Sequence, residues 1–393
     1  TMAFVRILNI LIKDKTLGAR VVPIVPDESR TFGMEGMFRQ LGIWNQLGQL
    51  YTPQDADQLM FYKESKTGQI LQEGINEAGA LADWIAAATS YSTHGVQMLP
   101  VYICYSMFGM QRTMDLVWAA ADQRARGFLV GGTAGRTTLN GEGLQHEDGH
   151  SHLLSATIPN CISYDPTFAY EVAVIVQDGV RRMLAEQEDV FYYLTVMNEN
   201  YEHPEMPSGS EAGILKGMYQ FRKAAASNAP RVQLLGSGAI FREAIAAAEL
   251  LRQDWGVEAD LWSCPSFTEL ARDGQDCARW NLLHPDDKPR VAHVAGCLAD
   301  TRGPVIAATD YVRLFAEQIR PYVPRAYTVL GTDGFGRSDT RAKLRHFFEV
   351  DRHWITLAAL RALADEGQID AKRVAEAIAK YALDPNKTNP LKV

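Results

Sequence analysis

The stretch Gly127-Phe128-Leu129-Val130-Gly131 is a short apolar run of strand length that ends in glycine. Three further runs share its length and composition: 21–25, 99–103 and 191–196. Helical periodicity lies between such runs, as in residues 78–90 and 170–184. Strands that alternate with helices form parallel sheets, because each crossover helix must bury its apolar stripe against the sheet. The pattern therefore predicts an α/β fold with mainly parallel sheets flanked by helices.

A second α/β pattern follows a break in the sequence. Residues 203–212 contain the run His203-Pro204-Glu205-Met206-Pro207-Ser208-Gly209-Ser210, whose proline, glycine and serine content predicts a linker. Strands, a glycine turn and helices then resume at 232–238, 241–252, 305–308, 327–330 and 354–381. We therefore predict two domains, residues 1–202 and residues 213–393.

Composition excludes several classes of protein. Hydrophobic residues make up 47% and charged residues 22%, and no apolar run is long enough to span a membrane, so a soluble protein is expected. The net charge of −8 is spread along the chain, which argues against nucleic acid or a membrane surface as a partner. Five cysteines without a C-x-x-C spacing favour a reducing cytoplasm over a disulfide framework.

The first residues suggest that the chain begins inside a longer polypeptide. Position 1 is threonine rather than methionine, and residues 2–11 have the pattern of an amphipathic helix that is already under way. No basic segment followed by an apolar stretch and small residues, which would mark secretion, is present there.

Residues 131–152 hold the densest cluster of functional residue types: six glycines, three histidines and three carboxylates directly after a predicted strand. Open parallel sheets carry their ligand loops at this position. The alternative is that these residues only form and cap tight turns. His146-Glu147-Asp148-Gly149-His150 also matches the zinc-protease pattern H-E-x-x-H, but that pattern requires a helix, and Gly149 costs about 1 kcal/mol in a helix interior. We therefore expect loop histidines.

Three other segments have both a functional and a structural interpretation. Glu77 follows Asn76 at the start of a predicted helix, where an N-cap and a first-turn carboxylate are ordinary features. The aromatic residues of 102–110 follow a strand, where they could form core or stack on a flat heterocycle. The glycine turns 236–238 and 331–337 could hold an anion, but neither completes a known phosphate-binding pattern, so tight turns are favoured.

Taken together, four motifs closely resemble the homodimeric bacterial pyruvate dehydrogenases, the decarboxylating components of pyruvate dehydrogenase complexes. These motifs are Gln72-Glu73-Gly74-Ile75-Asn76-Glu77, Tyr105-Ser106-Met107-Phe108-Gly109, the run 141–152 and the run 331–339. The resemblance extends over the whole chain. It implies a transketolase-like pyrimidine-binding domain followed by a transketolase C-terminal-like domain.

The resemblance also implies roles for individual residues. Glu77 matches the glutamate that hydrogen-bonds the aminopyrimidine of thiamin diphosphate and thereby promotes proton removal from the thiazolium ring. Phe108 matches the residue that stacks on the pyrimidine, and Tyr105 lies near the substrate. His146 is implied to orient the substrate and to assist transfer of the acetyl group. Further implied residues are Glu28 for catalysis and Ile75 and Glu142 for cofactor binding.

The chain departs from the family in one respect. Family members carry G-D-G and a downstream asparagine in a preceding domain, which bind Mg²⁺ and the diphosphate. The closest matches here, Gln177-Asp178-Gly179, Arg272-Asp273-Gly274 and Thr332-Asp333-Gly334, all lack the first glycine. We therefore expect no metal ligands in this chain and Mg²⁺ ligands in a missing N-terminal portion. Because this chain would then hold only half of the cofactor site, we expect at most weak cofactor binding and no turnover by the chain alone.

The activity implied by the resemblance is oxidative decarboxylation of pyruvate with reductive acetylation of the lipoyl domain of a dihydrolipoyl acetyltransferase, by a homodimer. A transketolase-type two-carbon transferase is the alternative within the fold. That activity would need arginines for sugar phosphates, and only Arg136 stands out in a suitable loop. More distant alternatives are a zinc peptidase on His146 and His150 and a folded dimerisation module without activity.

Overall fold

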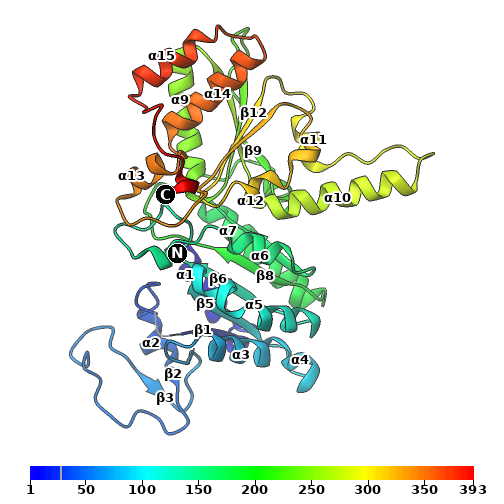
Figure 1. Ribbon diagram of the computed structural model, residues 1–393. Helices are drawn as coiled ribbons and strands as arrows, with labels where there is room; N and C mark the ends of the chain where they lie inside the picture. Colours follow the sequence, from blue (N-terminus) through cyan, green and yellow to red (C-terminus); the bar gives the residue numbers. More distant parts are fainter. Residues whose placement is uncertain (27–28) are drawn as a thin grey trace. The chain divides into compact units, whose positions relative to one another are not determined.

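The computed structural model describes residues 1–26 and 29–393 and contains two compact units (Figure 1). The first unit comprises residues 1–134, 154–163 and 175–198. The second comprises residues 135–153, 164–174 and 199–393. Each unit is built on its own sheet. The domain boundaries 1–202, 203–212 and 213–393 stay a prediction.

The sheet of the first unit has six strands in the order β4-β1-β5-β6-β8-β7. Its strands are β1 (Val21–Val25), β4 (Leu71–Gln72), β5 (Leu99–Tyr105), β6 (Phe128–Gly132), β7 (Cys161–Tyr164) and β8 (Phe191–Thr195). Strands β4, β1, β5, β6 and β8 pair in parallel. Every residue of β1, β6 and β8 is buried, because helices cover both faces of a parallel sheet. The four apolar runs therefore form the strands that the sequence predicts.

Two helices of the first unit matter for the candidate site. Helix α3 (Glu77–Ala88) follows β4, and α5 (Ser106–Asp122) follows β5, so both begin at the carboxyl ends of parallel strands. The two helices pack against each other. Trp84 of α3 is fully buried, and its Nε1 donates to the Phe128 carbonyl over 3.0 Å, which fixes α3 on the sheet.

None of the remaining α-helices and strands before residue 199 carries a predicted site residue. They are α1 (Met2–Lys13), α2 (Gly36–Leu41), α4 (Ser90–Thr93), α6 (Ser151–Ala156), α7 (Ala169–Val180) and the two-stranded sheet of β2 (Ile43–Trp44) and β3 (Glu64–Ser65). The predicted helix 170–184 differs slightly, since α7 ends at Val180 and a π-helical turn continues through Ala185.

The sheet of the second unit has five strands in the order β13-β12-β10-β11-β9. Its strands are β9 (Tyr219–Arg222), β10 (Arg231–Gly236), β11 (Glu258–Ser263), β12 (Val305–Ala308) and β13 (Tyr327–Leu330). Only the edge strand β9 pairs in antiparallel fashion, and a bulge interrupts its pairing with β11 between Leu261 and Trp262. Both sheets together establish an α/β fold with mainly parallel strands.

Helices cover both faces of this second sheet (Figure 1). Val232 and Leu234 of β10 pack into one hydrophobic cluster, whereas Leu235 belongs to the cluster on the opposite face, as the two-residue period of a strand requires. The helices are α8 (Glu211–Lys216), α9 (Phe241–Trp255), α10 (Phe267–Leu283), α11 (His293–Leu298), α12 (Leu314–Glu317), α13 (Arg341–Phe347), α14 (Arg352–Asp365) and α15 (Lys372–Lys380). The predicted helical region 354–381 is thus two helices, and Gly367 with a φ of +70° lies between them.

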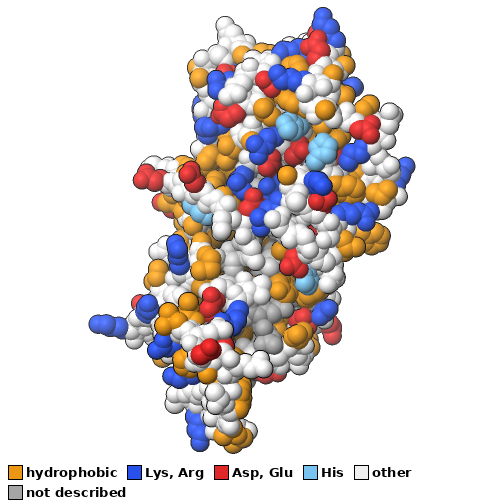
Figure 2. Space-filling view, turned by 90° about the vertical axis from the view of Figure 1, so that its left-hand side faces the viewer, with side chains coloured by type: hydrophobic (Ala, Val, Ile, Leu, Met, Phe, Trp, Pro, Cys, Tyr) orange, Lys and Arg blue, Asp and Glu red, His pale blue; other side chains and the backbone are white. Residues whose placement is uncertain are grey.

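Figure 2 shows side chains of both charges interspersed with hydrophobic ones over the face in view. Among residues 1–26 and 29–393, no helix has the length and hydrophobicity needed to cross a membrane.

Candidate functional site

Glu77 lies in the first turn of α3. The Asn76 side chain caps this helix by accepting a hydrogen bond from the Gly79 amide over 3.1 Å, which confirms the predicted N-cap. The Glu77 side chain is only 11% exposed. A carboxylate at this position benefits from the partial positive charge of the helix N-terminus.

Arg112 of α5 contacts both Glu77 and Phe108. Its Nη1 donates to Glu77 Oε1 over 3.0 Å, and its guanidinium carbon lies 4.2 Å from the centre of the Phe108 ring. Phe108 and Arg112 are four residues apart on one helix, so their side chains lie on the same face. The Arg112 side chain is itself 53% exposed. Glu77, Arg112 and Phe108 therefore form one cluster at the N-terminal turns of α3 and α5.

Tyr105 extends this cluster at the carboxyl end of β5. Its ring packs edge-on against Phe108 with centroids 5.9 Å apart, and against Phe32 at 5.6 Å. Ile75, in the turn before α3, is 76% exposed. Of the residues predicted for catalysis or cofactor binding, Glu77, Phe108 and Tyr105 are thus linked in one cluster, and Glu28 lies outside the described residues.

His146 and Glu142 are predicted site residues of the second unit. His146 ends a single 3-10 turn (Leu144–His146), and its Nδ1 lies 3.0 Å from Glu142 Oε2. Residues 147–150 are not helical, so the zinc-peptidase alternative lacks the helix on which it depends. Within residues 1–26 and 29–393, no group of three or more histidine, cysteine, aspartate or glutamate side chains is arranged to hold a metal ion.

Asp148 shapes the loop that carries His146. Its Oδ1 accepts hydrogen bonds from the amides of His150 and Ser151 at 3.0 and 2.9 Å, and its Oδ2 accepts one from the Ser151 hydroxyl. Asp148 is fully buried. These contacts organise the start of α6, so Asp148 acts as a structural residue of the loop.

Arg136 forms hydrogen bonds to the backbone of the glycine turn at 331–337. Its Nη1 donates to the carbonyl of Thr332 over 2.6 Å and also to that of Gly334. At Thr332 and Gly334 the turn thus presents carbonyl oxygens to a guanidinium, in accordance with the tight-turn interpretation. Arg136 is 5% exposed, and burial lowers the pKa of its guanidinium.

Two buried carboxyl groups near Arg136 have perturbed acidity. Burial, aided by the charge of Asp310, raises the pKa of Glu147 to about 8. Burial likewise raises the pKa of Asp310 to about 7. Asp310 also accepts a hydrogen bond from the Thr137 amide over 3.2 Å. The sequence includes Glu147 only within a motif and gives no signal for Asp310, because Thr137 and Glu147, with which Asp310 interacts, lie more than 160 positions away.

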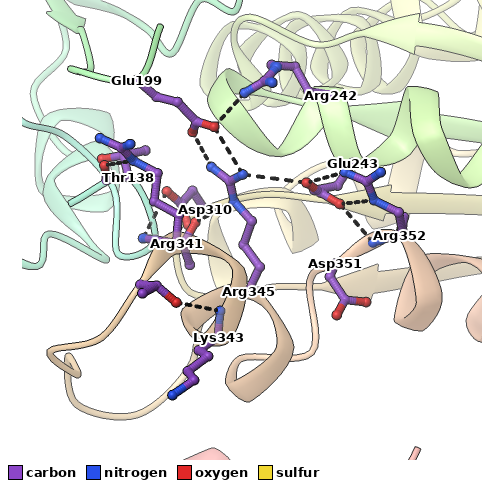
Figure 3. Close-up of polar contacts among 12 residues, drawn as sticks. Thr138, Glu199, Arg242, Glu243, Asp310, Arg341, Lys343, Arg345, Asp351 and Arg352 are labelled. Atoms are coloured by element: carbon purple, nitrogen blue, oxygen red, sulfur yellow. Dashed lines mark hydrogen bonds and ion pairs between the residues drawn. The ribbon is translucent and has the colours of Figure 1, made fainter. Parts of the chain in front are cut away.

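A buried ion-pair network joins four segments of the second unit (Figure 3). Arg345 of α13 contacts Glu199 and Glu243, Arg242 contacts Glu199 over 2.6 Å, and Arg352 contacts Glu243 over 2.9 Å. Burial raises the pKa of Glu199 and of Glu243, but hydrogen bonds and charge from the arginines outweigh it, so each pKa lies below its usual value. Because every carboxylate here is satisfied by arginines, this network stabilises the unit.

Two α/β units, the first with a glutamate in the first turn of a helix and edge-packed aromatic rings at the carboxyl ends of its parallel strands, are typical of the transketolase-like class. Solved transketolases share the fold. The enzyme from Campylobacter jejuni aligns with a TM-score of 0.64 at 16% identity, over 91% of this chain and 46% of that one. A split-gene transketolase, described as an inactive β4 tetramer, aligns with a TM-score of 0.59 at 15% identity, over 92% of this chain and 97% of that one.

The chain belongs to the pyruvate dehydrogenase E1 component family. The family described as the pyruvate dehydrogenase E1 component middle domain matches residues 1–204, and the transketolase-like C-terminal domain matches residues 217–351. The pyruvate dehydrogenase E1 component of Cupriavidus necator is 78% identical over this whole chain, and that of Escherichia coli K12 is 62% identical over 99% of it. The chain spans 44% of the length of each of these relatives.

Proposed function

We propose that this chain supplies the pyrimidine-binding half of a thiamin-diphosphate site in an enzyme that oxidatively decarboxylates pyruvate. The relatives from C. necator and E. coli carry the name pyruvate dehydrogenase E1 component, and they extend well beyond the region matched here. The diphosphate and Mg²⁺ are proposed to be held by residues outside this chain.

The observation that carries the proposal is the cluster of Glu77 and Phe108. A mostly buried carboxylate can accept a hydrogen bond from a ring N–H of an aminopyrimidine, and a phenyl ring beside it can stack on a flat heterocycle. The planar guanidinium of Arg112 makes both of these contacts. The residues present therefore fit the pyrimidine end of the cofactor.

Each predicted site residue has a proposed task. When bound, thiamin diphosphate supplies a nucleophilic carbon and an electron sink for the decarboxylation of a 2-oxoacid. Glu77 holds a proton at the pyrimidine ring and Phe108 orients that ring, while Ile75 and Glu142 are proposed as further cofactor contacts. Two further residues act on the substrate in this proposal. Tyr105 lines the pyruvate pocket, and His146, paired with Glu142, carries a proton during acetyl transfer to the lipoyl group. Glu28 is kept as a catalytic candidate.

The wider assignments are part of the same proposal. They are a homodimer, a cytoplasmic location and a lipoyl domain of dihydrolipoyl acetyltransferase as the acetyl acceptor. They rest on membership of the E1 component family.

A titration in a full-length protein tests the proposal. The hybrid enzyme is the C. necator relative in which this chain replaces the matching 394 residues. Calorimetry would measure the Kd of thiamin diphosphate at saturating Mg²⁺ for the hybrid enzyme and for this chain alone. The proposal expects binding by the hybrid enzyme and at least tenfold weaker binding by the chain. It also expects Glu77→Gln to abolish pyruvate decarboxylation.

Glu73→Gln is the matched control, because Glu73 is an exposed carboxylate four residues before Glu77. Equal loss of activity in both variants would contradict a specific role for Glu77. Tight Mg²⁺-dependent binding by the chain alone would contradict the division of the site.

A further inference from the structure

The loop that carries His146 comprises residues 135–150 and lies against a second segment of the same unit, residues 331–341. The Gly141 amide donates a hydrogen bond to the Asp339 carbonyl over 3.0 Å. The two segments are far apart in the sequence, so only the folded unit brings them together. The position of His146 therefore depends on the segment 331–341.

The backbone at Gly336 packs against the turn that ends in His146. A Cβ atom on Gly336 would lie 2.6 Å from Glu147 Cβ and 2.9 Å from the Leu144 carbonyl oxygen. Leu144 begins the single 3-10 turn and Glu147 directly follows it, so they flank His146 on both sides. A displacement of either segment would therefore move His146.

The side chain of Arg136 joins the two segments. Its Nη1 donates to the Thr332 carbonyl over 2.6 Å and also to the Gly334 carbonyl. A Cβ atom on Gly149 would overlap the Arg136 guanidinium, so this group lies directly against the backbone at the end of the His146 loop. Arg136 thus lies between the glycine turn and the residues that follow His146.

Arg341 makes a second link, from the opposite segment. Its Nε donates to the Thr138 carbonyl over 2.5 Å (Figure 3), and its backbone amide donates to Asn140 Oδ1 over 3.1 Å. We propose that Arg136 and Arg341 are positioning residues that hold His146 in place for the acetyl-transfer step. This inference rests on the task of His146 in the proposed function.

The chemistry of arginine suits Arg136 to this task. A guanidinium presents its N–H donors in a rigid plane, so it can bind two carbonyl groups and pack against a peptide at the same time, which a lysine cannot do. Arg136 is 5% exposed, and the charges of Asp148 and Asp310 raise the pKa of its guanidinium against the effect of burial. Its contacts are thus buried and compensated in charge. Such precision matters because a misplacement of about 1 Å can cost on the order of a hundredfold in rate.

The test is a double-mutant cycle with His146→Gln in the hybrid enzyme, with reductive acetylation of a lipoyl domain as the readout. Arg136→Lys keeps the charge but loses the planar donors. We expect it to slow acetyl transfer by about tenfold or more, and to slow decarboxylation, followed with an artificial electron acceptor, much less. In the His146→Gln background the same substitution should slow acetyl transfer further by less than about twofold, because the residue that it positions is gone.

Arg325→Lys is the matched control. Arg325 Nη2 also donates to backbone carbonyls, among them that of Leu298 over 3.3 Å, but Arg325 precedes β13 whereas the glycine turn follows it. This variant should change neither rate. Arg341→Met is the second variant, and it carries the test with the same expected dependence on His146 if Arg136→Lys does not fold.

A loss of acetyl transfer that is equally large with and without His146, or equally large in both assays, would show that the two arginines only stabilise the unit. That result would overturn this inference and leave the proposed function intact. The same holds if folded Arg136→Lys transfers acetyl groups at the unaltered rate. If His146→Gln itself leaves acetyl transfer unchanged, the proposed task of His146 is wrong and this inference is overturned with it.

Discussion

Arg345 forms two hydrogen bonds with the carboxylate of Glu199, although the two residues are 146 positions apart in the sequence. Their side chains are 7% and 11% exposed. Breaking a buried pair leaves an uncompensated charge, so Arg345→Met should lower the free energy of unfolding by about 3–5 kcal/mol. Urea denaturation measures this change.

The control for Arg345 is Arg361→Met. Arg361 pairs with Asp365 one helical turn away on the surface, and removal of such a pair should cost about 0.5 kcal/mol or less. Equal effects of the two substitutions would contradict the structural role of the network in Figure 3.

The raised pKa of Glu147 predicts that the difference in stability between the natural chain and a Glu147→Gln variant depends on pH. The folded protein holds a proton on Glu147 up to about pH 8, whereas the unfolded chain releases it near 4.5, so its contribution to stability falls as pH rises between these values. Glu147→Gln removes this titration. The variant should therefore gain stability relative to the natural chain from pH 5 to pH 8, reaching on the order of 2 kcal/mol. Urea midpoints at several pH values measure it, and a difference that is constant with pH would contradict this assignment.

The turn after β10 should be sensitive to substitution of Gly238. Its φ is +50°, and a Cβ atom there would lie 2.5 Å from Asp165 Oδ2. Gly238→Ala should therefore destabilise the chain by about 1–3 kcal/mol. Gly296→Ala is the control, because Gly296 lies within α11 and a Cβ would meet nothing within 4 Å. Thermal unfolding of both variants tests this, and similar Tm values for the two would count against the turn geometry.

Substitution of His146 should impair acetyl transfer selectively in the hybrid enzyme. If His146 carries a proton in that step, His146→Gln should reduce the reductive acetylation of a lipoyl domain by about a hundredfold. Decarboxylation followed with an artificial electron acceptor should fall much less. His94→Gln, at an exposed histidine at the end of α4, should change neither rate. Equal losses in both assays would show that His146 does not act specifically in acetyl transfer.

The fold was largely predictable because its strands are short, apolar and buried. Residues 127–131 and 305–308 form β6 and β12 almost as predicted, since strands covered on both faces need hydrophobic side chains throughout. Strand β11 was missed because it opens with Glu258 and Asp260, whose charges mask the pattern. Asp260 can be buried there because Arg231 pairs with it over 2.8 Å.

The candidate site was predictable only where it is local in the sequence. The cap formed by Asn76 and the helical position of Glu77 follow from adjacent residues. The contact of Arg112 with Phe108 could have been found from their spacing of four on one helix, but its contact with Glu77 joins two helices. Partners that are distant in sequence, such as Asp310 and Glu147, required the structure.

The central claim is that Glu77 promotes proton removal from a bound thiamin diphosphate. The most direct measurement is the rate at which the C2 proton of the cofactor exchanges with deuterated water in the hybrid enzyme, followed by quenched-flow NMR. We predict that Glu77→Gln slows this exchange by at least a hundredfold, whereas Glu73→Gln leaves it unchanged. An exchange rate in Glu77→Gln equal to that of the unaltered hybrid enzyme would contradict the account.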